Sequence, residues 1–395
     1  MITFAVPPIG GKGWFGGWMY MQNLVRALAG GDATDIETVL FIGPDRFENP
    51  EIRLLADLPR TRVVSDPAFD ETGLRCNVGW TLATGRNAAV LGAYNREKVD
   101  VALDPALYLG WRSEIPSIAW IPDFQHRHMP HMFSRGAYWK RDLGFRAQIG
   151  SAAAVMLSSE DAERDCLEFY PAAKGRTEVA RFAVPVSDWP DADAAWARLR
   201  QEGIPEDFIF LPNQLWQHKN HGLAIAAAAL LARRGSRRII LATGHGHDPR
   251  FPDYPDALKA QIRASGAEAN FRLMGSVDHA LVQAMMIGAN ALLNSSRFEG
   301  WSTTVEEGKS VATPLLLSDL RVHREQAPDA VFFGTDDAEA LANAIDVAAP
   351  RSLASIRASL KSAASAGVTR QSEFAAKVAQ IIRKAAHGAL ERRAL

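Results

Sequence analysis

Two short apolar runs joined by one loop and one helix constrain this chain more than any other feature. Residues 291–293 and residues 315–317 have the composition of buried strands. A polar loop that starts at Arg297 lies between them, followed by a helix that we expect to begin near Ser302. Strands linked by a crossover helix are parallel, and a parallel sheet binds its ligands where its strands end. We therefore expect a functional site in the loop that starts at Arg297.

Two carboxylates flank the expected start of this helix. Glu299 lies just past the first strand and Glu307 lies in the first turn, while Thr303 and Glu306 have the spacing of a capping box. A helix N-terminus suits a phosphate, and carboxylates accept hydrogen bonds from sugar hydroxyls, so a nucleotide sugar fits both. The stretch alone leaves another interpretation open, in which these acidic residues only complement the helix dipole.

The composition limits the possible partners. A chain of 395 residues predicts two or three domains at about 150 residues each, and we expect two similar α/β domains. The 44 Lys and Arg residues balance 45 Asp and Glu residues, which gives no electrostatic case for binding nucleic acid. Cys76 and Cys166 lack metal-ligand spacing, so we expect free thiols in a reducing cytoplasm.

Neither a signal peptide nor a membrane-spanning helix is expected. The first residues lack a charged segment and reach Pro7 and Pro8 too early for a signal peptide. The longest run rich in Ala and Leu, residues 223–232, is half of the roughly 20 residues that cross a membrane. A soluble protein, or one peripheral on the inner face of the cytoplasmic membrane, is expected.

Short strands alternate with turns or helices through the first half of the chain, which is typical of a parallel sheet covered by helices. The first strand, residues 2–6, leads into a glycine-rich loop that ends at Gly16 and Gly17 and precedes a helical pattern. The backbone N–H groups of such a loop can approach a phosphate. Four aromatic residues crowd the same turn and predict either core packing or stacking on a sugar or lipid: Trp14, Phe15, Trp18 and Tyr20.

A second polar loop follows the strand at residues 115–121. Asp123 and His126 come directly after the strand, at the edge where parallel sheets keep their ligands. Three interpretations remain open. The residues could position or polarise a substrate, the loop could be structural, or His126 could bind a metal with His128 and His131, although no matching carboxylate or cysteine set is evident.

The next helical segment, residues 138–146, is both aromatic and basic. A helix of this kind could rest on anionic lipid or bind a phosphorylated acceptor, or it could simply be a solvated face.

A stretch rich in Pro and Asp, residues 185–193, predicts a linker, and strand-and-helix alternation resumes at residues 208–211. The loop after that strand carries Lys219 near a helix start, where a phosphate could pair with it or where it could be an ordinary surface lysine. Two separate helices are predicted at the end of the chain, over residues 352–366 and residues 372–390.

In their order along the chain, these stretches resemble retaining glycosyltransferases of the GT-B fold, specifically the large GT4-type family, which includes bacterial polysaccharide and O-antigen transferases. Glu299 and Glu307 match the E-x7-E element of the family. Residues 212–221 resemble the loop whose lysine binds the donor phosphate, and Gly275 closes a turn similar to the one that contacts the base. The glycine loop and the loop of Asp123 also have counterparts in the family.

The resemblance implies two Rossmann-like α/β domains that face each other across a cleft. Glu299 would hold hydroxyls of the donor sugar, Glu307 the ribose hydroxyls and Lys219 the diphosphate, while Asp123 or His126 would face the reacting sugar. Side chains and helix ends would neutralise the leaving group, so no metal or other cofactor is expected. The implied donor-binding set is completed by Gly16, Gly17, Gly275, Arg297, Gly300, Trp301, Ser302 and Thr303.

The chain departs from the family pattern at three places. Gln214 stands where many relatives carry a phosphate-binding arginine, so Arg297 or His218 is expected to compensate. Ser302 and the two threonines after it replace the usual Gly-Leu-Pro, and Pro122 replaces the histidine that often precedes the aspartate.

The resulting prediction is a metal-independent, retaining hexosyltransferase of cell-surface polysaccharide or lipopolysaccharide synthesis. It takes a nucleotide-sugar donor and a carbohydrate or lipid-linked glycan acceptor. The predicted parts are an acceptor domain (1–186), a linker (187–204), a donor domain (205–370) and a C-terminal helix that packs back on the first domain (371–395). An epimerase, a phosphorylase or a non-catalytic binding subunit remains an alternative. GDP-mannose, UDP-sugars, GDP-fucose and dTDP-rhamnose all remain open as donors.

Overall fold

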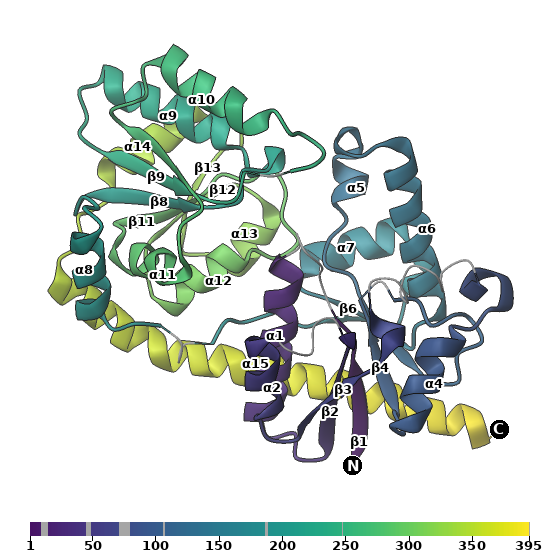
Figure 1. Ribbon diagram of the computed structural model, residues 1–395. Coiled ribbons are helices and arrows are strands. Elements are labelled where there is room, and N and C mark those ends of the chain that lie inside the picture. The colour runs from purple at the N-terminus through teal and green to yellow at the C-terminus, as the bar shows by residue number, and fades with distance from the viewer. Residues whose placement is uncertain are drawn as a thin grey trace. The chain divides into compact units, whose positions relative to one another are not determined.

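A computed structural model describes residues 1–8, 15–44, 49–70, 80–105, 107–185, 189–246 and 248–394. The side chains of Phe15, Pro50 and residues 389–394 are outside this description. Most of the predicted glycine loop, together with Trp14 and Cys76, also lies outside the described residues. The chain divides into two compact units, residues 1–183 with 370–395 and residues 184–369 (Figure 1).

Unit 1 is built on a seven-stranded parallel sheet of order β3-β2-β1-β4-β5-β6-β7. Its strands are β1 (Ile2–Val6), β2 (Ile36–Ile42), β3 (Thr61–Ser65), β4 (Val101–Asp104), β5 (Ser117–Trp120), β6 (Ala154–Leu157) and β7 (Thr177–Val179). Its helices include α1 (Phe15–Gly30), α2 (Pro50–Ala56), α4 (Ala88–Arg96), α5 (Gln125–His128), α6 (Arg135–Ser151) and α7 (Glu160–Phe169). Short 3-10 turns occur at η2 (Pro67–Phe69), η3 (Pro130–Met132) and η4 (Pro171–Ala173).

Unit 2 is built on a six-stranded parallel sheet of order β10-β9-β8-β11-β12-β13. Its strands are β8 (Phe208–Pro212), β9 (Ile239–Thr243), β10 (Phe271–Gly275), β11 (Ala291–Asn294), β12 (Leu315–Ser318) and β13 (Val331–Phe333). Its helices are α8 (Ala192–Gln201), α9 (His221–Arg233), α10 (Tyr254–Ser265), α11 (His279–Gly288), α12 (Thr303–Ser310), α13 (Arg321–Gln326) and α14 (Ala338–Val347), with a 3-10 turn η5 (Gln217–Lys219).

The central strands of unit 2 bury both of their faces. Ile209 and Leu211 of β8 pack into one apolar cluster with α9, whereas Phe208 and Phe210 pack into another with α11. Successive side chains of a strand point to opposite faces, so a run of apolar residues without alternation is what a sheet covered by helices on both sides requires. This packing fixes the two central strands, β8 and β11, and therefore also fixes where the loops after them begin.

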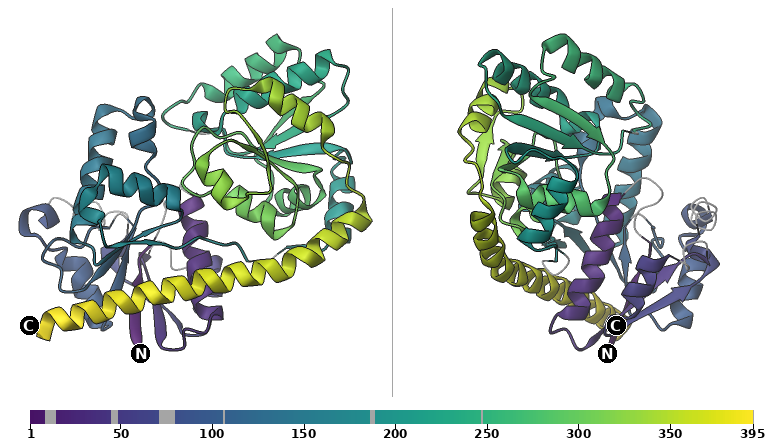
Figure 2. Two further views of the ribbon diagram at one scale, coloured as in Figure 1. Left: turned by 180° about the vertical axis from the view of Figure 1, so that it is seen from behind. Right: turned by 60° about the vertical axis from the view of Figure 1, so that its left-hand side comes forward.

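The C-terminal part of the chain forms one helix where the sequence predicted two. Helix α15 (Leu353–Ala394) runs without interruption through the expected break (Figure 2). The prediction of a break was wrong because the intervening segment contains no proline, and its single glycine, Gly367, costs a helix only about 1 kcal/mol.

The last part of α15 belongs to unit 1. Phe374 is buried and its ring centroid lies 6.2 Å from that of Tyr20 and 6.3 Å from that of Phe182. Arg383 donates two hydrogen bonds to Asp35, at 2.6 and 2.8 Å. Apolar packing and ion pairs therefore both attach this segment to the first sheet and its helices.

The segment predicted as a linker contains helix α8, which belongs to unit 2. Leu199 of α8 approaches Gly288 of α11 so closely that a Cβ at Gly288 would meet the leucine side chain at 2.3 Å. Within the described residues, no helix is both long enough and apolar enough to cross a membrane.

Candidate active site

The order of strands in unit 2 reverses between β8 and β11. Chain connections run outward from β8 to β9 and β10 on one side, and from β11 to β12 and β13 on the other. The loops at the carboxyl ends of two such strands diverge, which leaves room for a ligand. The loop after β8 carries Lys219 and the loop after β11 carries Glu299, so the topology brings these two predicted residues together.

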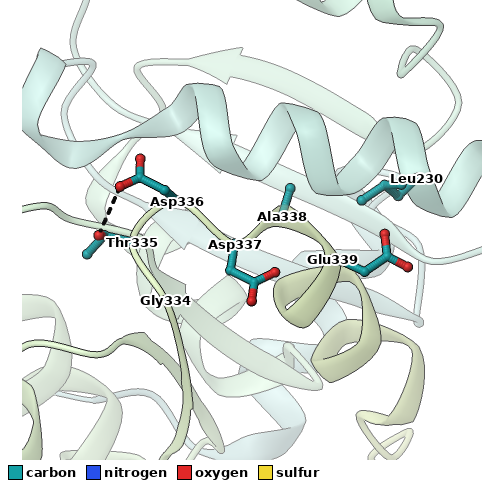
Figure 3. Close-up of a pocket in the computed structure, with 7 residues that line it drawn as sticks. All are labelled: Leu230, Gly334, Thr335, Asp336, Asp337, Ala338 and Glu339. Atoms are coloured by element: carbon teal, nitrogen blue, oxygen red, sulfur yellow. Dashed lines mark hydrogen bonds between the residues drawn. The ribbon is translucent and has the colours of Figure 1, made fainter.

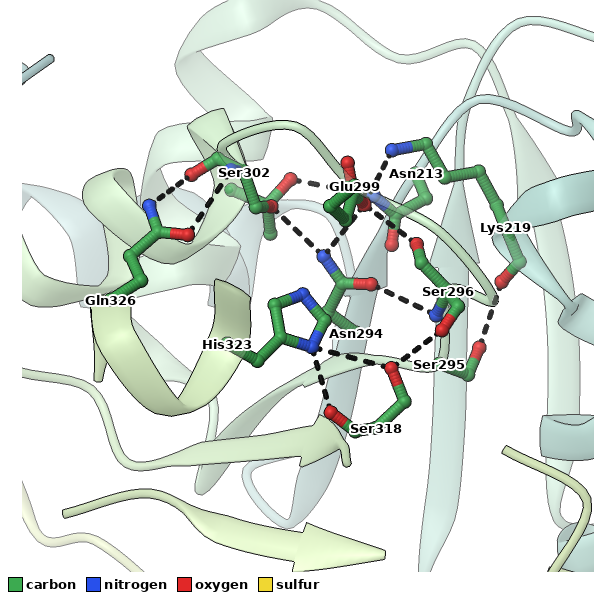
Figure 4. Close-up of polar contacts among 11 residues, drawn as sticks. Asn213, Lys219, Asn294, Ser295, Ser296, Glu299, Ser302, Ser318, His323 and Gln326 are labelled. Carbon is green, nitrogen blue, oxygen red and sulfur yellow. Dashed lines mark hydrogen bonds and ion pairs between the residues drawn. The ribbon is translucent and has the colours of Figure 1, made fainter. Parts of the chain in front are cut away.

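Lys219 and Glu299 form an ion pair at this edge of the sheet (Figure 4). The distance from Lys219 Nζ to Glu299 Oε1 is 2.7 Å, and the two side chains are only 15% and 9% exposed. The same carboxylate oxygen accepts hydrogen bonds from Ser296 Oγ at 2.6 Å and Asn294 Nδ2 at 3.2 Å. Three donors on one oxygen hold the Glu299 carboxylate in a single orientation.

These contacts keep Glu299 ionised. Burial by itself raises the pKa of this carboxyl, but the positive charge of Lys219 and its hydrogen bond act in the opposite direction and lower the pKa to about 2. A carboxyl whose pKa is lowered by folding stabilises the protein above its unfolded pKa, and that stability is lost as the pH falls towards 2.

The loop that carries Lys219 is attached at several points. Ser295 Oγ donates to the carbonyls of Lys219 and Asn220, at 2.9 and 3.3 Å, and Arg297 N donates to the carbonyl of His218 at 2.8 Å. Asn220 has a left-handed backbone, with φ of 56°, and its Nδ2 donates to the carbonyl of Thr335 at 2.8 Å. These hydrogen bonds fix the backbone from which the Lys219 side chain reaches Glu299.

Helix α12 begins one residue earlier than a capping box would place it. Ser302 is its N-cap residue, so Glu306 is the fourth residue of the helix and cannot reach back to the cap. Glu306 is buried and accepts hydrogen bonds from Lys309 Nζ at 2.8 Å and Gln326 Nε2 at 3.0 Å. The predicted capping box of Thr303 and Glu306 was therefore wrong.

Glu307 lies in an environment opposite to that of Glu299. Its side chain is partly buried, and no described residue donates a hydrogen bond to its carboxylate. Burial raises the pKa of this carboxyl to about 8. The two glutamates thus differ in charge, since Glu299 is ionised at neutral pH whereas Glu307 holds its proton.

Arg297 does not join the Lys219–Glu299 pair. It donates to Asp336 at 2.5 Å, and both side chains are exposed. Asp336 follows β13 and borders a pocket of about 710 Å³ that is lined by Leu230 and residues 334–339 (Figure 3). The three carboxylates of this pocket, Asp336, Asp337 and Glu339, make it a poor site for an anion. The prediction that Arg297 compensates for Gln214 has no support in these contacts.

The remaining residues of the predicted donor set lie along the carboxyl edge of the same sheet. Gly275 ends the edge strand β10 in a left-handed conformation, with φ of 73°, and its carbonyl accepts a hydrogen bond from Gly244 N at 2.9 Å. Gly300 and Trp301 lie between Glu299 and the start of α12, and the Trp301 ring faces Lys309 Nζ at 5.9 Å.

In unit 1, Asp123 and His126 follow β5 as predicted, but they are in different environments. Asp123 is about a quarter exposed and accepts hydrogen bonds from Arg141 Nη2 at 2.7 Å and Gln125 N at 2.8 Å. His126 has no exposed surface, and its Nε2 lies 3.0 Å from the Tyr170 hydroxyl. Burial lowers the pKa of His126 to about 4, which leaves the ring neutral. A substrate could reach Asp123 directly, but it could reach His126 only if the packing around the ring changed.

The histidines near Asp123 do not converge on one point. His128 lies 2.6 Å from Asp165, while His126 faces Tyr170. Within the part of the chain that the structure describes, no group of three or more His, Cys, Asp or Glu side chains could hold a metal ion. The geometry therefore gives no support to the interpretation of this loop as a metal site.

The described end of the glycine loop consists of Gly16 and Gly17, which lie in the first turn of α1. Gly16 is exposed and Gly17 is buried. Tyr20 is buried and stacks on Trp120, with ring centroids 4.0 Å apart. Trp18 Nε1 donates to Glu51 at 2.5 Å. Stacking of Tyr20 on a sugar or lipid is thereby contradicted, because its ring is already packed inside unit 1.

Residues 197–362 match the family model described as "Glycosyl transferases group 1". The matched stretch contains Lys219, Gly275, Glu299 and Glu307. These residues form a group 1 glycosyltransferase domain. The chain thus contains a GT4-type glycosyltransferase domain at residues 197–362, and its fold is GT-B.

Solved structures of glycosyltransferases share this fold along nearly the whole chain. A sucrose-phosphate synthase from Thermosynechococcus elongatus has a TM-score of 0.70 at 17% identity, with 97% of this chain and 98% of that chain covered. A glycosyltransferase from Rickettsia africae has a TM-score of 0.67 at 13% identity, with the same coverage. HepE from Anabaena, in complex with UDP and glucose, has a TM-score of 0.67 at 15% identity, with 96% and 98% covered. A search of curated proteins finds no match.

Several polar residues of the glycosyltransferase domain escaped the sequence analysis. Asn294, Gln326 and His323 are all buried, and Figure 4 shows them in the neighbourhood of Ser302 and Glu299. His323 Nδ1 lies 2.8 Å from the carbonyl of Ser318, and no described residue hydrogen-bonds its Nε2. A polar residue at the end of an apolar run, such as Asn294 after Ala-Leu-Leu, was the available signal. Gln326 gave none, because it lies 24 residues after Ser302, to which it is hydrogen-bonded.

The raised pKa of Glu307 predicts how the stability of the protein depends on pH. Between its unfolded pKa of 4.5 and its folded pKa of about 8, the folded state binds more protons than the unfolded state, so stability falls as the pH rises through this window. The substitution Glu307→Gln removes that penalty. We expect the melting temperature of the variant to exceed that of the parent by several degrees at pH 8 and by much less at pH 5. The control is Glu268→Gln, at an exposed residue. A difference that does not change with pH would contradict the assigned environment of Glu307.

Proposed function

We propose that the chain is a retaining, metal-independent hexosyltransferase that transfers a sugar from a nucleoside diphosphate sugar to a carbohydrate acceptor. The observation that carries this proposal is the buried Lys219–Glu299 pair just before helix α12, whose fifth residue, Glu307, accepts no hydrogen bond on its side chain from any described residue. A cation, a helix N-terminus and two carboxylates match the diphosphate and the hydroxyls of such a donor.

Each group has one role in the proposal. Lys219 has three N–H donors and uses one on Glu299, which leaves two for the diphosphate. Glu299 holds hydroxyls of the donor sugar, and Glu307 accepts hydrogen bonds from the ribose hydroxyls, which supply the donors that its carboxylate lacks in the free protein. Asp123, whose side chain is partly exposed, acts on the reacting sugar. The bond between the sugar carbon and the diphosphate oxygen breaks, the oxygen of an acceptor hydroxyl bonds to the same carbon, and the hydroxyl proton passes to the released diphosphate. Lys219 with the α12 N-terminus stabilises the departing charge.

The donor class can be tested with the purified protein. A ligand present at 100 times its Kd raises stability by about 2.7 kcal/mol. Among UDP, GDP, dTDP, ADP and CDP, we expect one to raise the melting temperature by several degrees, and its monophosphate to raise it less, because Lys219 and the α12 N-terminus face the diphosphate. Thermal shift measures this effect. If no nucleoside diphosphate changes the melting temperature, the chain does not bind the proposed donor class.

The role of Lys219 can be tested by the substitution Lys219→Ala. Loss of a group that stabilises the leaving charge is expected to reduce turnover by about 100- to 1000-fold, measured as the rate of sugar release from the donor. The melting temperature should also fall, since Glu299 loses its buried partner. The matched control is Lys259→Ala on α10, where the lysine is exposed and pairs with the exposed Asp256. A folded Lys219→Ala variant that transfers sugar at the parent rate would show that the role is misassigned.

We further propose that the acceptor is a lipid-linked glycan of bacterial cell-surface polysaccharide or O-antigen synthesis, met at a membrane surface. Helix α6 supports this proposal. Trp139 and Leu143, one turn apart, are 56% and 59% exposed. The only acidic residue of α6, Asp142, is buried and paired with Arg127 and Arg146, so the exposed charges of the helix are all positive. An apolar pair among cations fits the surface of an anionic bilayer.

Vesicle sedimentation tests this surface. The parent protein is expected to sediment with vesicles that contain phosphatidylglycerol and not with vesicles of phosphatidylcholine alone. The double substitution Trp139→Glu and Leu143→Glu should weaken this binding by about tenfold or more, because it removes the apolar contact and adds like charge. Leu54→Glu, on α2, serves as the control, since Leu54 is equally exposed at 62%. Equal sedimentation of the parent with both kinds of vesicle, or of the double variant with the parent, would rule the surface out.

A further inference from the structure

Ser302 is held at three points by two side-chain amides. The N–H of Ser302 donates to Gln326 Oε1 at 3.1 Å, and its carbonyl accepts from Gln326 Nε2 at 2.8 Å. Its hydroxyl accepts a hydrogen bond from Asn294 Nδ2 at 2.9 Å. Figure 4 shows Gln326 on one side of Ser302 and Asn294 on the other. All three residues are buried.

This arrangement keeps Ser302 from capping its own helix. The hydroxyl of an N-cap serine normally accepts a hydrogen bond from the backbone N–H two or three residues later. Ser134 does so at the start of α6, through Ala137 N, and Ser159 does so at the start of α7, through Ala162 N. Ser302 makes no such bond, and its hydroxyl is engaged by Asn294 instead. The first-turn N–H groups of α12 therefore have no side-chain acceptor in the described chain.

The two amides also connect Ser302 to Glu299 and Glu306. Asn294 Nδ2 donates to Glu299 Oε1 at 3.2 Å as well as to the Ser302 hydroxyl. Gln326 Nε2 donates to Glu306 Oε1 at 3.0 Å, and Lys309 Nζ connects Glu306 to the carbonyl of Gln326, at 2.8 and 2.9 Å. These hydrogen bonds thus connect three segments around Ser302: the end of α13, the end of β11 and the first turn of α12.

We infer that Gln326 and Asn294 are positioning residues for the donor diphosphate. They hold Ser302 in an N-cap position while withholding its hydroxyl from the helix, so that the first-turn N–H groups of α12 remain free to bind phosphate oxygens. This inference rests on the proposed function, because it assumes a diphosphate ligand at α12. It assigns to Gln326, a residue that does not touch the ligand, control over the affinity for the phosphates and not for the nucleoside.

The test compares two probes on one variant. Gln326→Met keeps the length of the side chain and removes its three hydrogen bonds. We expect its affinity for the nucleoside diphosphate that binds the parent best to fall about tenfold, the loss of roughly one hydrogen bond to a charged group. Its affinity for the corresponding nucleoside, which has no phosphate, should not change. Calorimetric titration of UDP or GDP against uridine or guanosine measures both affinities.

The matched control is Asn270→Leu. Asn270 is also a buried amide of unit 2 and also donates to two backbone carbonyls, those of Ser236 and Arg238, at 2.8 and 2.7 Å. It lies at the amino end of β10, on the edge of the sheet opposite to α12. Asn270→Leu should lower the melting temperature and leave both affinities unchanged. This separates loss of a buried amide from loss of phosphate positioning.

A second variant covers the case in which Gln326→Met does not fold. Asn294→Ser removes the donor that holds the Ser302 hydroxyl and lets this hydroxyl cap α12, so the same selective loss of diphosphate affinity is expected. The inference is overturned if the folded variant binds diphosphate as the parent does, or if diphosphate and nucleoside lose affinity equally. A parent protein that binds no nucleoside diphosphate would instead refute the proposed function, and the inference with it.

Discussion

The contact between Lys219 and Glu299 organises unit 2, which contains the glycosyltransferase domain. The two side chains come from the strands between which the sheet order reverses, and each is largely buried. Breaking such a pair by removing one partner costs about 3–5 kcal/mol, because the other charge stays buried without compensation. Ser295, Ser296 and Asn294, which follow or end β11, add the hydrogen bonds that hold both partners in place. The proposed donor site thus depends on a charge pair that requires β8 and β11 to lie side by side.

The environments of Glu299 and Glu307 explain how one short stretch can treat two parts of a ligand differently. Glu299 accepts three hydrogen bonds on one oxygen and remains ionised, whereas Glu307 is partly buried, accepts no hydrogen bond on its side chain from a described residue and is protonated in the free protein. A bound diol would complete the hydrogen bonding of Glu307. Under the proposed function, Glu299 is already held in one orientation before the donor binds, whereas the hydrogen bonding of Glu307 is completed by the donor.

The sequence indicated part of the proposed donor site because strand ends can be predicted from apolar runs that stop at polar residues. Lys219 and Glu299 were found in this way, Glu307 by its place in the following helix and Gly275 by the family resemblance, and the strand order brings the loops of Lys219 and Glu299 together. Helix boundaries were harder to predict from the sequence. The two predicted C-terminal helices form the single helix α15, since no local signal separates a tolerated glycine from a break. Arg297 was expected beside Lys219, but its side chain pairs with Asp336, which comes from a different loop.

The sequence by itself determined that this chain forms parallel α/β sheets and that its chemistry follows β8 and β11, because the periodicity of apolar residues and the residues at strand ends are local properties. Only the tertiary structure decided which polar side chains meet. Three such features depend on segments distant in sequence: the burial of His126 against Tyr170, the environment of Glu307, and the hydrogen bonds between Gln326 and Ser302. Burial and hydrogen-bond partners set the charge and orientation of a side chain, and both arise only when the chain has packed.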